Sequence, residues 1–173
     1  MGLDISYYSK LVAAVGNEGF DEDGEVKYDD GWFTFYKNPD FPGRADDIQD
    51  GAAYMDSDDS GFSAGSYGGY NRWREQLAEL AGYELTEYND YGRAAKCHAA
   101  ACWHGAEGPF SELINFSDCE GVIGATVSAK LARDFKEFQD KADKHCDEYF
   151  REKYAEWRKA FETAADGGAV RFH

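Results

Sequence analysis

Alternating apolar and polar side chains at the start of the chain predict a strand over residues 3–8. In this segment Leu3, Ile5 and Tyr7 share one face, and the polar side chains between them share the other. Short apolar or aromatic runs, each bounded by turn signals, predict further strands. These runs lie at residues 31–36, 52–55, 83–88, 113–116 and 169–173.

Residues 94–103 fit two structures. Their alanines favour a helix, whereas the apolar run at 110–116 favours a hairpin that turns through Gly105 and Gly108. The sequence leaves both possibilities open.

A short helix is predicted over about residues 69–81, because apolar side chains recur there every three or four positions and Gly82 follows as a stop signal. The recurring apolar residues are Tyr70, Trp73, Leu77 and Leu80.

A much longer helical pattern covers about residues 126–165, with Thr126 or Ser128 as the N-cap. Some 40 residues at ~1.5 Å each would span ~60 Å, which exceeds the width of a domain of this size. We therefore expect either a break near residues 144–148, which gives an antiparallel helix pair, or a helix that projects past the body. The predicted class is α+β: one domain over residues 1–173, with a mostly antiparallel sheet of about five or six strands under the helices.

Charge narrows the possible partners. The 173 residues include 34 Asp and Glu against 18 Lys and Arg, a net charge of -16, and residues 17–30 form an acidic surface loop. This surface should repel nucleic acid and anionic membranes, and it suits a partner with a basic surface, a cation, or simple solubility. The chain has no apolar run of ~20 residues and no basic leader, so we expect a cytoplasmic protein with four reduced cysteines. No cofactor motif is present, and no cofactor is expected.

Two segments resemble metal sites in part. The acids and glycine between Asp56 and Gly61 fall at EF-hand positions, but Tyr67 occupies the position that needs a bidentate Glu. The spacing of the second group is wrong for common zinc knuckles, and small buried cysteines with surface histidines are the alternative. That second group is Cys97, His98, Cys102 and His104.

A glycine-rich turn opens the first predicted helix. Residues 61–69 hold four glycines, and such a turn can bind an anion through its backbone N–H groups. Neither the Walker pattern nor the dinucleotide fingerprint is present, so a turn whose glycines permit close packing is the alternative. The candidate ligand-binding residues are Ser66, Tyr67, Tyr70, Arg72 and Arg74.

A second polar turn spans residues 117–121, and we expect it to share a pocket with the first. Its candidate ligand-binding residues are Ser117, Asp118 and Glu120. Cys119 between them is a candidate nucleophile for a hydrolase, but the flanking acids should raise its pKa and no nucleophile-elbow motif is present. A structural role as a hinge between sheet and helix is the alternative.

Residues 1–5 (MGLDI), 65–74 (GSYGGYNRWR) and 109–121 (PFSELINFSDCEG) together resemble a family of uncharacterised proteins from phages, prophages and bacteria. The resemblance implies no known activity and no site residues. It implies a small acidic phage-borne protein, a class that often antagonises host defence or host nucleic-acid enzymes.

Three functions follow as hypotheses. The first is a non-catalytic acidic binding protein, phage- or prophage-encoded, that antagonises a host defence or nucleic-acid-binding protein. The second is a small-molecule binder that holds a nucleotide-like or anionic ligand at the two polar turns. The third is a hydrolase-type enzyme at Asp118-Cys119-Glu120.

Overall fold

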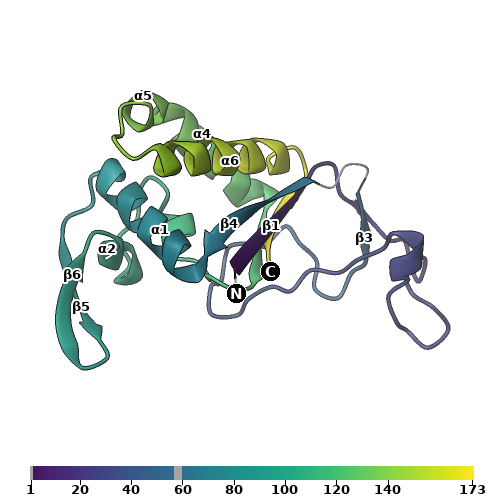
Figure 1. Cartoon of the computed structure of the whole chain (residues 1–173). Coiled ribbons are helices and arrows are strands. Elements are labelled where there is room, and N and C mark those ends of the chain that lie inside the picture. Colours follow the sequence, from purple (N-terminus) through teal and green to yellow (C-terminus); the bar gives the residue numbers. More distant parts are fainter. Residues whose placement is uncertain (1, 57–59) are drawn as a thin grey trace.

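The chain folds into helices packed on antiparallel sheets, as the residue pattern predicts. The computed structural model describes residues 2–56 and 60–173. Within these residues, one four-stranded sheet lies beneath the main helices, and two other sheets have two strands each (Figure 1). The predicted α+β class is confirmed. No helix in this part of the chain is long and apolar enough to cross a membrane.

The alternating segment at the start of the chain becomes an inner strand of the main sheet. β1 (Gly2–Tyr8) pairs with β4 (Ser60–Ser66) on one side and with β8 (Ala169–Phe172) on the other. β7 (Gly121–Gly124) pairs with β8, which gives the antiparallel order β4-β1-β8-β7. The strand predicted at the end of the chain is therefore confirmed.

The two faces of this sheet are covered by different parts of the chain. Leu3 and Ile5 are buried in the larger core beneath the helices. On the opposite face, a smaller apolar cluster lies under a loop, and Phe33 from that loop stacks on Tyr8 with ring centroids 4.8 Å apart.

The first predicted helix is confirmed as α1 (Tyr67–Ala81). Ser66 caps it, because its Oγ accepts a hydrogen bond from Gly69 N at 3.1 Å. Gly82 ends it in the left-handed conformation, and its N–H donates to carbonyls of the last turn.

The long helical pattern is broken near residues 144–148, as expected. It forms α4 (Ala125–Glu137), a short α5 (Gln139–Ala142) and α6 (Glu148–Ala164), and α6 runs back beside α4 (Figure 1). Tyr154 Oη donates to the carbonyl of Phe135 at 2.7 Å, which ties the two long helices together.

Neither predicted N-cap of the long helix acts as one. Gly124 occupies the N-cap position of α4 and offers no side chain. Asp47 caps the helix from a distant loop instead, since its Oδ2 accepts from Thr126 N at 2.8 Å. Ser128 is fully buried.

The strand predicted at residues 113–116 is wrong. The segment forms one helical turn, α3 (Ser111–Ile114), whose Leu113 and Ile114 are fully buried. A short apolar run does not distinguish a buried helical turn from a buried strand, because neither shows the alternation that marks a half-exposed strand.

The hairpin through Gly105 and Gly108, one of the two structures that the sequence left open for residues 94–103, does not form among the described residues. β5 (Thr86–Asp90), three residues later than the predicted start at residue 83, pairs with β6 (Arg93–Cys97) instead. Of the alanines that favour a helix, Ala94 and Ala95 lie in β6, and the three that follow His98 begin α2 (Ala99–Trp103).

The strand predicted at residues 31–36 is wrong as well. Only Phe33 makes a strand-like contact, an isolated bridge to Tyr54 of β3 (Tyr54–Met55), which itself pairs with β2 (Val12–Ala13). Phe33 and Phe35 of this segment pack on the sheet face, and high strand propensity often reflects such packing rather than a backbone preference.

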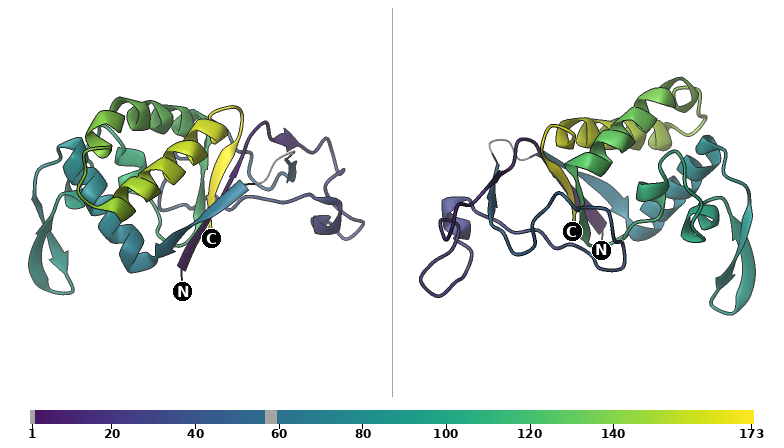
Figure 2. Two further views of the ribbon diagram at one scale, coloured as in Figure 1. Left: turned by 45° about the horizontal axis from the view of Figure 1, so that its top comes forward. Right: turned by 180° about the vertical axis from the view of Figure 1, so that it is seen from behind.

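Two segments project from opposite ends of the molecule (Figure 2). The β5–β6 hairpin extends at one end. At the other end lies the acidic loop, residues 17–30, which includes the short 3-10 helix η1 (Tyr28–Asp30).

Candidate functional site

The prediction of a glycine-rich turn at residues 61–69 is wrong, because these residues form β4 as far as Ser66 and α1 from Tyr67 onward. The last glycine of β4 serves packing. Gly65 has φ +89°, and a Cβ on it would lie 2.7 Å from Tyr149 Oη of α6. Tyr149 Oη also donates to the carbonyl of Ala64 at 3.3 Å. This end of the predicted site is therefore where α6 approaches β4.

One turn along α1, the predicted ligand-binding residues point in different directions. Tyr70 is fully buried and stacks on Trp157 with ring centroids 5.5 Å apart. Burial raises the pKa of Tyr70 to about 12. Arg72 is exposed on the opposite side. Helical geometry separates these side chains, because residues two positions apart do not share a face.

Arg74 is buried, and its guanidinium serves the backbone of α3. Its Nη1 donates to the carbonyls of Ile114 at 3.3 Å and Phe116 at 2.5 Å, and its Nη2 donates to Asn71 Oδ1. The guanidinium carbon also lies 4.5 Å from the Tyr70 ring centroid. These contacts leave Arg74 little capacity to bind an anion.

The second polar turn meets α1 at a single side-chain contact. Asn71 Nδ2 donates to Asp118 Oδ2 at 3.0 Å. Ser117 shapes the turn, since its Oγ accepts from Cys119 N at 3.2 Å and Glu120 N at 3.0 Å. The second turn therefore reaches α1 through Asn71 rather than through the glycines.

Cys119 lies on the surface of this turn. Its Sγ is 3.5 Å from Ser117 Oγ, and within residues 2–56 and 60–173 no imidazole lies within hydrogen-bonding distance of the thiol. A cysteine nucleophile needs such a base or another device that lowers its pKa.

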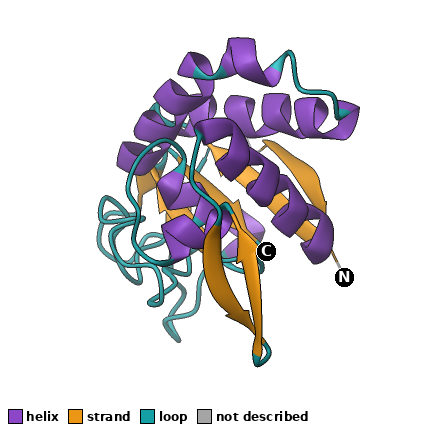
Figure 3. Cartoon of the chain, turned by 90° about the vertical axis from the view of Figure 1, so that its left-hand side faces the viewer, coloured by secondary structure: helices purple, strands orange, loops and turns teal. Residues whose placement is uncertain are grey.

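A cleft of about 460 Å³, here called the aromatic cleft, opens beside the Asn71–Asp118 contact. It lies between α1, α2 and the β5–β6 hairpin, which Figure 3 shows in front of the helices. Its walls include Asn71, Glu75, Tyr88, Cys97, Trp103 and Asp118.

Aromatic rings and carboxylates meet in the aromatic cleft. Tyr88 and Trp103 contact edge to face, with ring centroids 5.3 Å apart. Glu75 accepts from the backbone N–H groups of His98 and Ala99, both at 2.8 Å, and so fixes the start of α2.

Both titratable groups beside Glu75 are held in their protonated forms. The pKa of Tyr88 is raised by desolvation and by the negative charges of Asp90, Cys97 and Glu75. The pKa of the Cys97 thiol is raised mainly by burial. The thiol is therefore a poor nucleophile, and the local field favours a cation.

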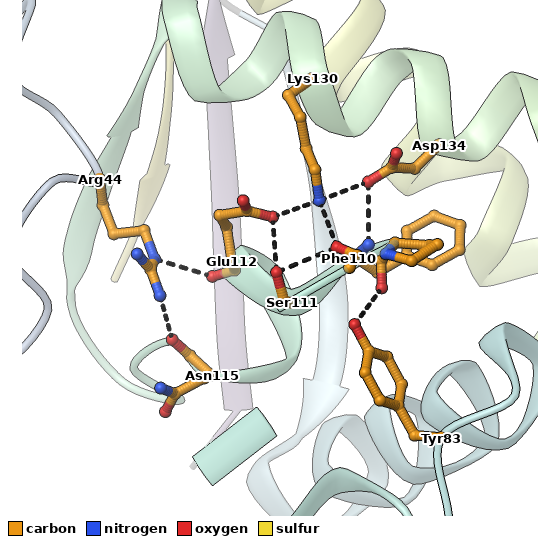
Figure 4. Close-up of polar contacts among 10 residues, drawn as sticks. Arg44, Tyr83, Phe110, Ser111, Glu112, Asn115, Lys130 and Asp134 are labelled. Carbon is orange, nitrogen blue, oxygen red and sulfur yellow. Dashed lines mark hydrogen bonds and ion pairs between the residues drawn. The ribbon is translucent and has the colours of Figure 1, made fainter. Parts of the chain in front are cut away.

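A second and larger cleft, the charged cleft, is lined by residues of α3 and α4 and has a volume of about 570 Å³ (Figure 4). Its walls include Arg44, Glu107, Ser111, Glu112, Lys130 and Asp134. Lys130 Nζ contacts Glu112 Oε2 at 2.6 Å, Asp134 Oδ2 at 2.8 Å and the carbonyl of Gly108 at 2.5 Å. These three contacts use all three donors of the ammonium group.

The Lys130 network holds a strained loop. Phe110 has φ +60°, which is rare for a bulky side chain, and its N–H donates to Asp134 Oδ2 at 2.8 Å. Tyr83 Oη donates to the carbonyl of Pro109 at 3.0 Å on the other side of the loop (Figure 4). The buried Phe110 ring packs on Phe135.

Arg44 is a second cation of the charged cleft. It donates to the carbonyls of Glu112 at 3.1 Å and Asn115 at 3.2 Å, and burial lowers its pKa. In the described part of the chain, no carboxylate lies within 4.0 Å of its guanidinium nitrogens. Arg44 therefore offers its remaining N–H groups to the cleft.

The residues of the partial zinc motif are held by contacts of their own. His98 Nδ1 lies 2.5 Å from the carbonyl of Tyr83, His104 is exposed, and burial raises the pKa of Cys102 to about 11. Among the described residues, no group of three or more His, Cys, Asp or Glu is placed to hold a metal ion. Half of the calcium-like segment at residues 56–61, namely residues 57–59, lies outside the described residues.

Sequence reasoning and structure agree on only part of the candidate site. Arg74 and Asp118 line one cleft, whereas Tyr70 is core and Glu120 is an exposed turn residue. The other predicted residues, Ser66, Tyr67, Arg72 and Ser117, are not among the cleft residues.

Several residues of the two clefts were missed by sequence reasoning. Asn71 and Glu75 could have been found, because they lie four positions apart on one face of a predicted helix. Lys130 and Asp134 form a similar pair. Trp103 and Arg44 gave no such signal.

Comparison with protein-family models, curated proteins and solved structures finds no match for this chain, and the resemblance to phage proteins stays a prediction.

Proposed function

We propose that this protein is a non-catalytic binding protein whose acidic surface engages a partner with a basic surface. The supporting observation is that few of its acids are neutralised internally. Leaving out Asp58 and Asp59 from the 34 acids gives 32 described ones, and six of these form ion pairs. The paired acids are Asp50, Glu112, Asp134, Glu156, Glu162 and Asp166.

Unpaired surface charge of one sign destabilises the compact state by self-repulsion, and it accelerates association with a surface of opposite sign. The acidic loop concentrates this charge: its seven acids and one lysine give a net charge of -6 over residues 17–30. Asp21 keeps the loop ordered, since its Oδ1 accepts from the N–H groups of Asp23 at 3.0 Å and Glu25 at 2.8 Å.

The resemblance to phage-borne proteins adds a partner class, a host defence or nucleic-acid-binding protein.

Capture from a nuclease-treated bacterial lysate tests the proposal. The immobilised protein should retain proteins with basic surfaces at low salt and release them at moderate salt, as mass spectrometry of each fraction would show. Retention that is insensitive to salt, or retention of partners without basic surfaces, would contradict it.

Two charge-matched variants locate the surface. The loop variant neutralises four exposed acids that have no side-chain hydrogen bond: Glu22→Gln, Asp23→Asn, Asp29→Asn and Asp30→Asn. The control removes the same charge from exposed positions outside the acidic loop: Glu79→Gln, Glu137→Gln, Asp140→Asn and Glu152→Gln. Only the loop variant should lose most of the captured protein, whereas equal losses would show that net charge alone matters.

A second candidate function is binding of a small anionic ligand in the charged cleft. It is favoured by Arg44, whose guanidinium faces a cleft of about 570 Å³ without a carboxylate partner among the described residues. A thermal-shift screen of carboxylates and nucleotides should give a stabilising hit that Arg44→Gln abolishes. Lack of any hit, or an equal shift in the variant, would reject this function.

A further inference from the structure

The aromatic cleft is distinguished from the rest of the acidic surface by its ring faces. Trp103 is 43% exposed although it ends a helix whose other face is buried, and Tyr88 meets it edge to face. An exposed indole beside carboxylates is the arrangement that recognises an organic cation, because the ring face is electronegative.

The polar groups of the cleft leave room for a cation. Asp118 Oδ2 accepts from Asn71, and its Oδ1 accepts no hydrogen bond from another residue that the structure describes, so Oδ1 remains available. Arg74, the one positive charge in the wall, is directed at backbone carbonyls and at the Tyr70 ring. The guanidinium of Arg74 is therefore occupied by contacts within the protein. An acceptor oxygen of Asp118 and the rings of Trp103 and Tyr88 are left to bind a ligand.

We propose that the aromatic cleft receives the guanidinium or ammonium group of an Arg or Lys side chain of a protein partner. The cation would lie against Trp103 and Tyr88 and would donate an N–H hydrogen bond to Asp118 Oδ1. This inference rests on the proposed function and adds a second contact with the basic partner, because the β5–β6 hairpin that forms one wall of the cleft lies at the opposite end of the molecule from the acidic loop (Figure 2). The volume of about 460 Å³ is in the range of sites that enclose a small group.

The surroundings of the cleft fit a protein partner rather than a free amine. On the hairpin that forms one wall, Tyr91 at the tip is fully exposed, and Leu85 just before the hairpin is 60% exposed. Exposed aromatic and aliphatic residues around a charged contact are typical of interfaces between proteins.

The experiment follows the indole N–H resonance of Trp103 in proton–nitrogen correlation spectra, assigned by its loss in Trp103→Leu. The probe is N-acetyl-L-arginine amide, and N-acetyl-L-citrulline amide is its neutral isostere. The arginine probe should shift the Trp103 resonance with a dissociation constant on the order of a millimolar, and the citrulline probe should not. Equal shifts with both probes, or no shift with either, would overturn the inference.

Variants separate the cleft from general charge attraction. Asp118→Asn should weaken the arginine probe by about 2-fold to 30-fold, as should Trp103→Leu when binding is followed through neighbouring amide resonances. Tyr91→Ala removes a fully exposed aromatic outside the cleft and should leave the affinity for the arginine probe unchanged. An effect of Tyr91→Ala as large as that of Trp103→Leu would overturn the assignment to the cleft.

The inference and the proposed function can fail separately. If the arginine probe binds at Trp103 but no basic partner is captured, the proposed function fails and a free guanidinium or amine ligand replaces the protein partner, which also overturns this inference. If a salt-sensitive basic partner is captured by the acidic loop but the probe leaves Trp103 unshifted, only the inference fails.

Discussion

The charged cleft and the aromatic cleft contain similar charged groups and arrange them in opposite ways. In the charged cleft, Lys130 binds Glu112, Asp134 and a backbone carbonyl, so its charge maintains the protein's own loop. In the aromatic cleft, Asp118 makes one hydrogen bond to Asn71 and remains accessible. The presence of charge in a cleft is therefore a poor guide to ligand binding. The number of donors and acceptors left unpaired is a better one.

The largest expected effect comes from removing the cation of the charged cleft. Lys130→Met leaves two carboxylates that are 26% and 13% exposed without their shared partner, and it releases the strained loop. We expect the free energy of unfolding to fall by about 2–4 kcal/mol in urea titrations. Lys10→Met is the control, because the Lys10–Asp166 pair is 72% and 70% exposed and should contribute less than about 1 kcal/mol. Equal effects of the two substitutions would remove the contrast between a structural and a surface charge.

A smaller effect is expected from Glu75→Gln in the aromatic cleft. Glu75 supports two backbone N–H groups at the start of α2, and one amide oxygen replaces only part of this support. Stability should fall by about 1 kcal/mol, measured by urea titration.

Loss of the Glu75 carboxylate should also lower the pKa of Cys97, for which the Glu75 charge is a contributing cause after burial. Alkylation of Cys97 at pH 8 should then be faster than in the unmodified protein, and an unchanged rate would show that burial alone protects the thiol.

High pH tests the charged cleft through Cys102, which lines it. Burial raises the folded pKa of this thiol from 9.0 to about 11. Between these values the unfolded chain releases a proton that the folded chain keeps, so stability should be full below pH 9 and fall as the pH rises toward 11. Urea titrations at pH 8 and pH 10 should show this fall, and Cys102→Ala should reduce it. If Cys102→Ala lost as much stability between pH 8 and pH 10 as the unmodified protein does, another group would be responsible for the fall.

The smallest effect on stability is expected for Asp118→Asn. The amide oxygen can still accept from Asn71, so unfolding free energy should change by less than about 0.5 kcal/mol. The same substitution should weaken the arginine probe, because the charge that attracts the cation is lost. A large loss of stability would place Asp118 with Lys130 among the structural charges and would end the contrast between the two clefts.

Local signals predicted the parts of the fold whose boundaries depend on adjacent residues. The start and end of α1 follow from Ser66 and Gly82, which are a side-chain cap and a left-handed stop within the same stretch of chain. The break before α6 was expected from length alone. It lies where Asp147 caps the new helix, with its Oδ1 accepting from Phe150 N at 3.4 Å.

The predictions that were wrong concern features that depend on contacts between distant parts of the chain. The cap of α4 comes from Asp47, a residue 79 positions earlier, and no local pattern announces such a partner. Residues 113–116 read as a strand because they are apolar, yet their backbone carbonyls are held by Arg74 and Arg44 in a helical turn. The candidate site failed for the same reason, since Arg72 and Arg74 look equivalent in sequence and only one of them faces α3.

By itself, the sequence determined the class of the fold, its principal helices and its acidic character, because periodicity, caps and charge are properties of neighbouring residues or of composition. Only the tertiary structure decided which charges remain free. Arg74 and Lys130 donate their hydrogen bonds to carbonyls and carboxylates from distant segments. Asp118 lines the same cleft as Trp103, and only its Oδ2 accepts a hydrogen bond from a described residue. Such pairings depend on how α1, α2 and α3 pack together, and packing brings together residues that the order of the chain keeps apart.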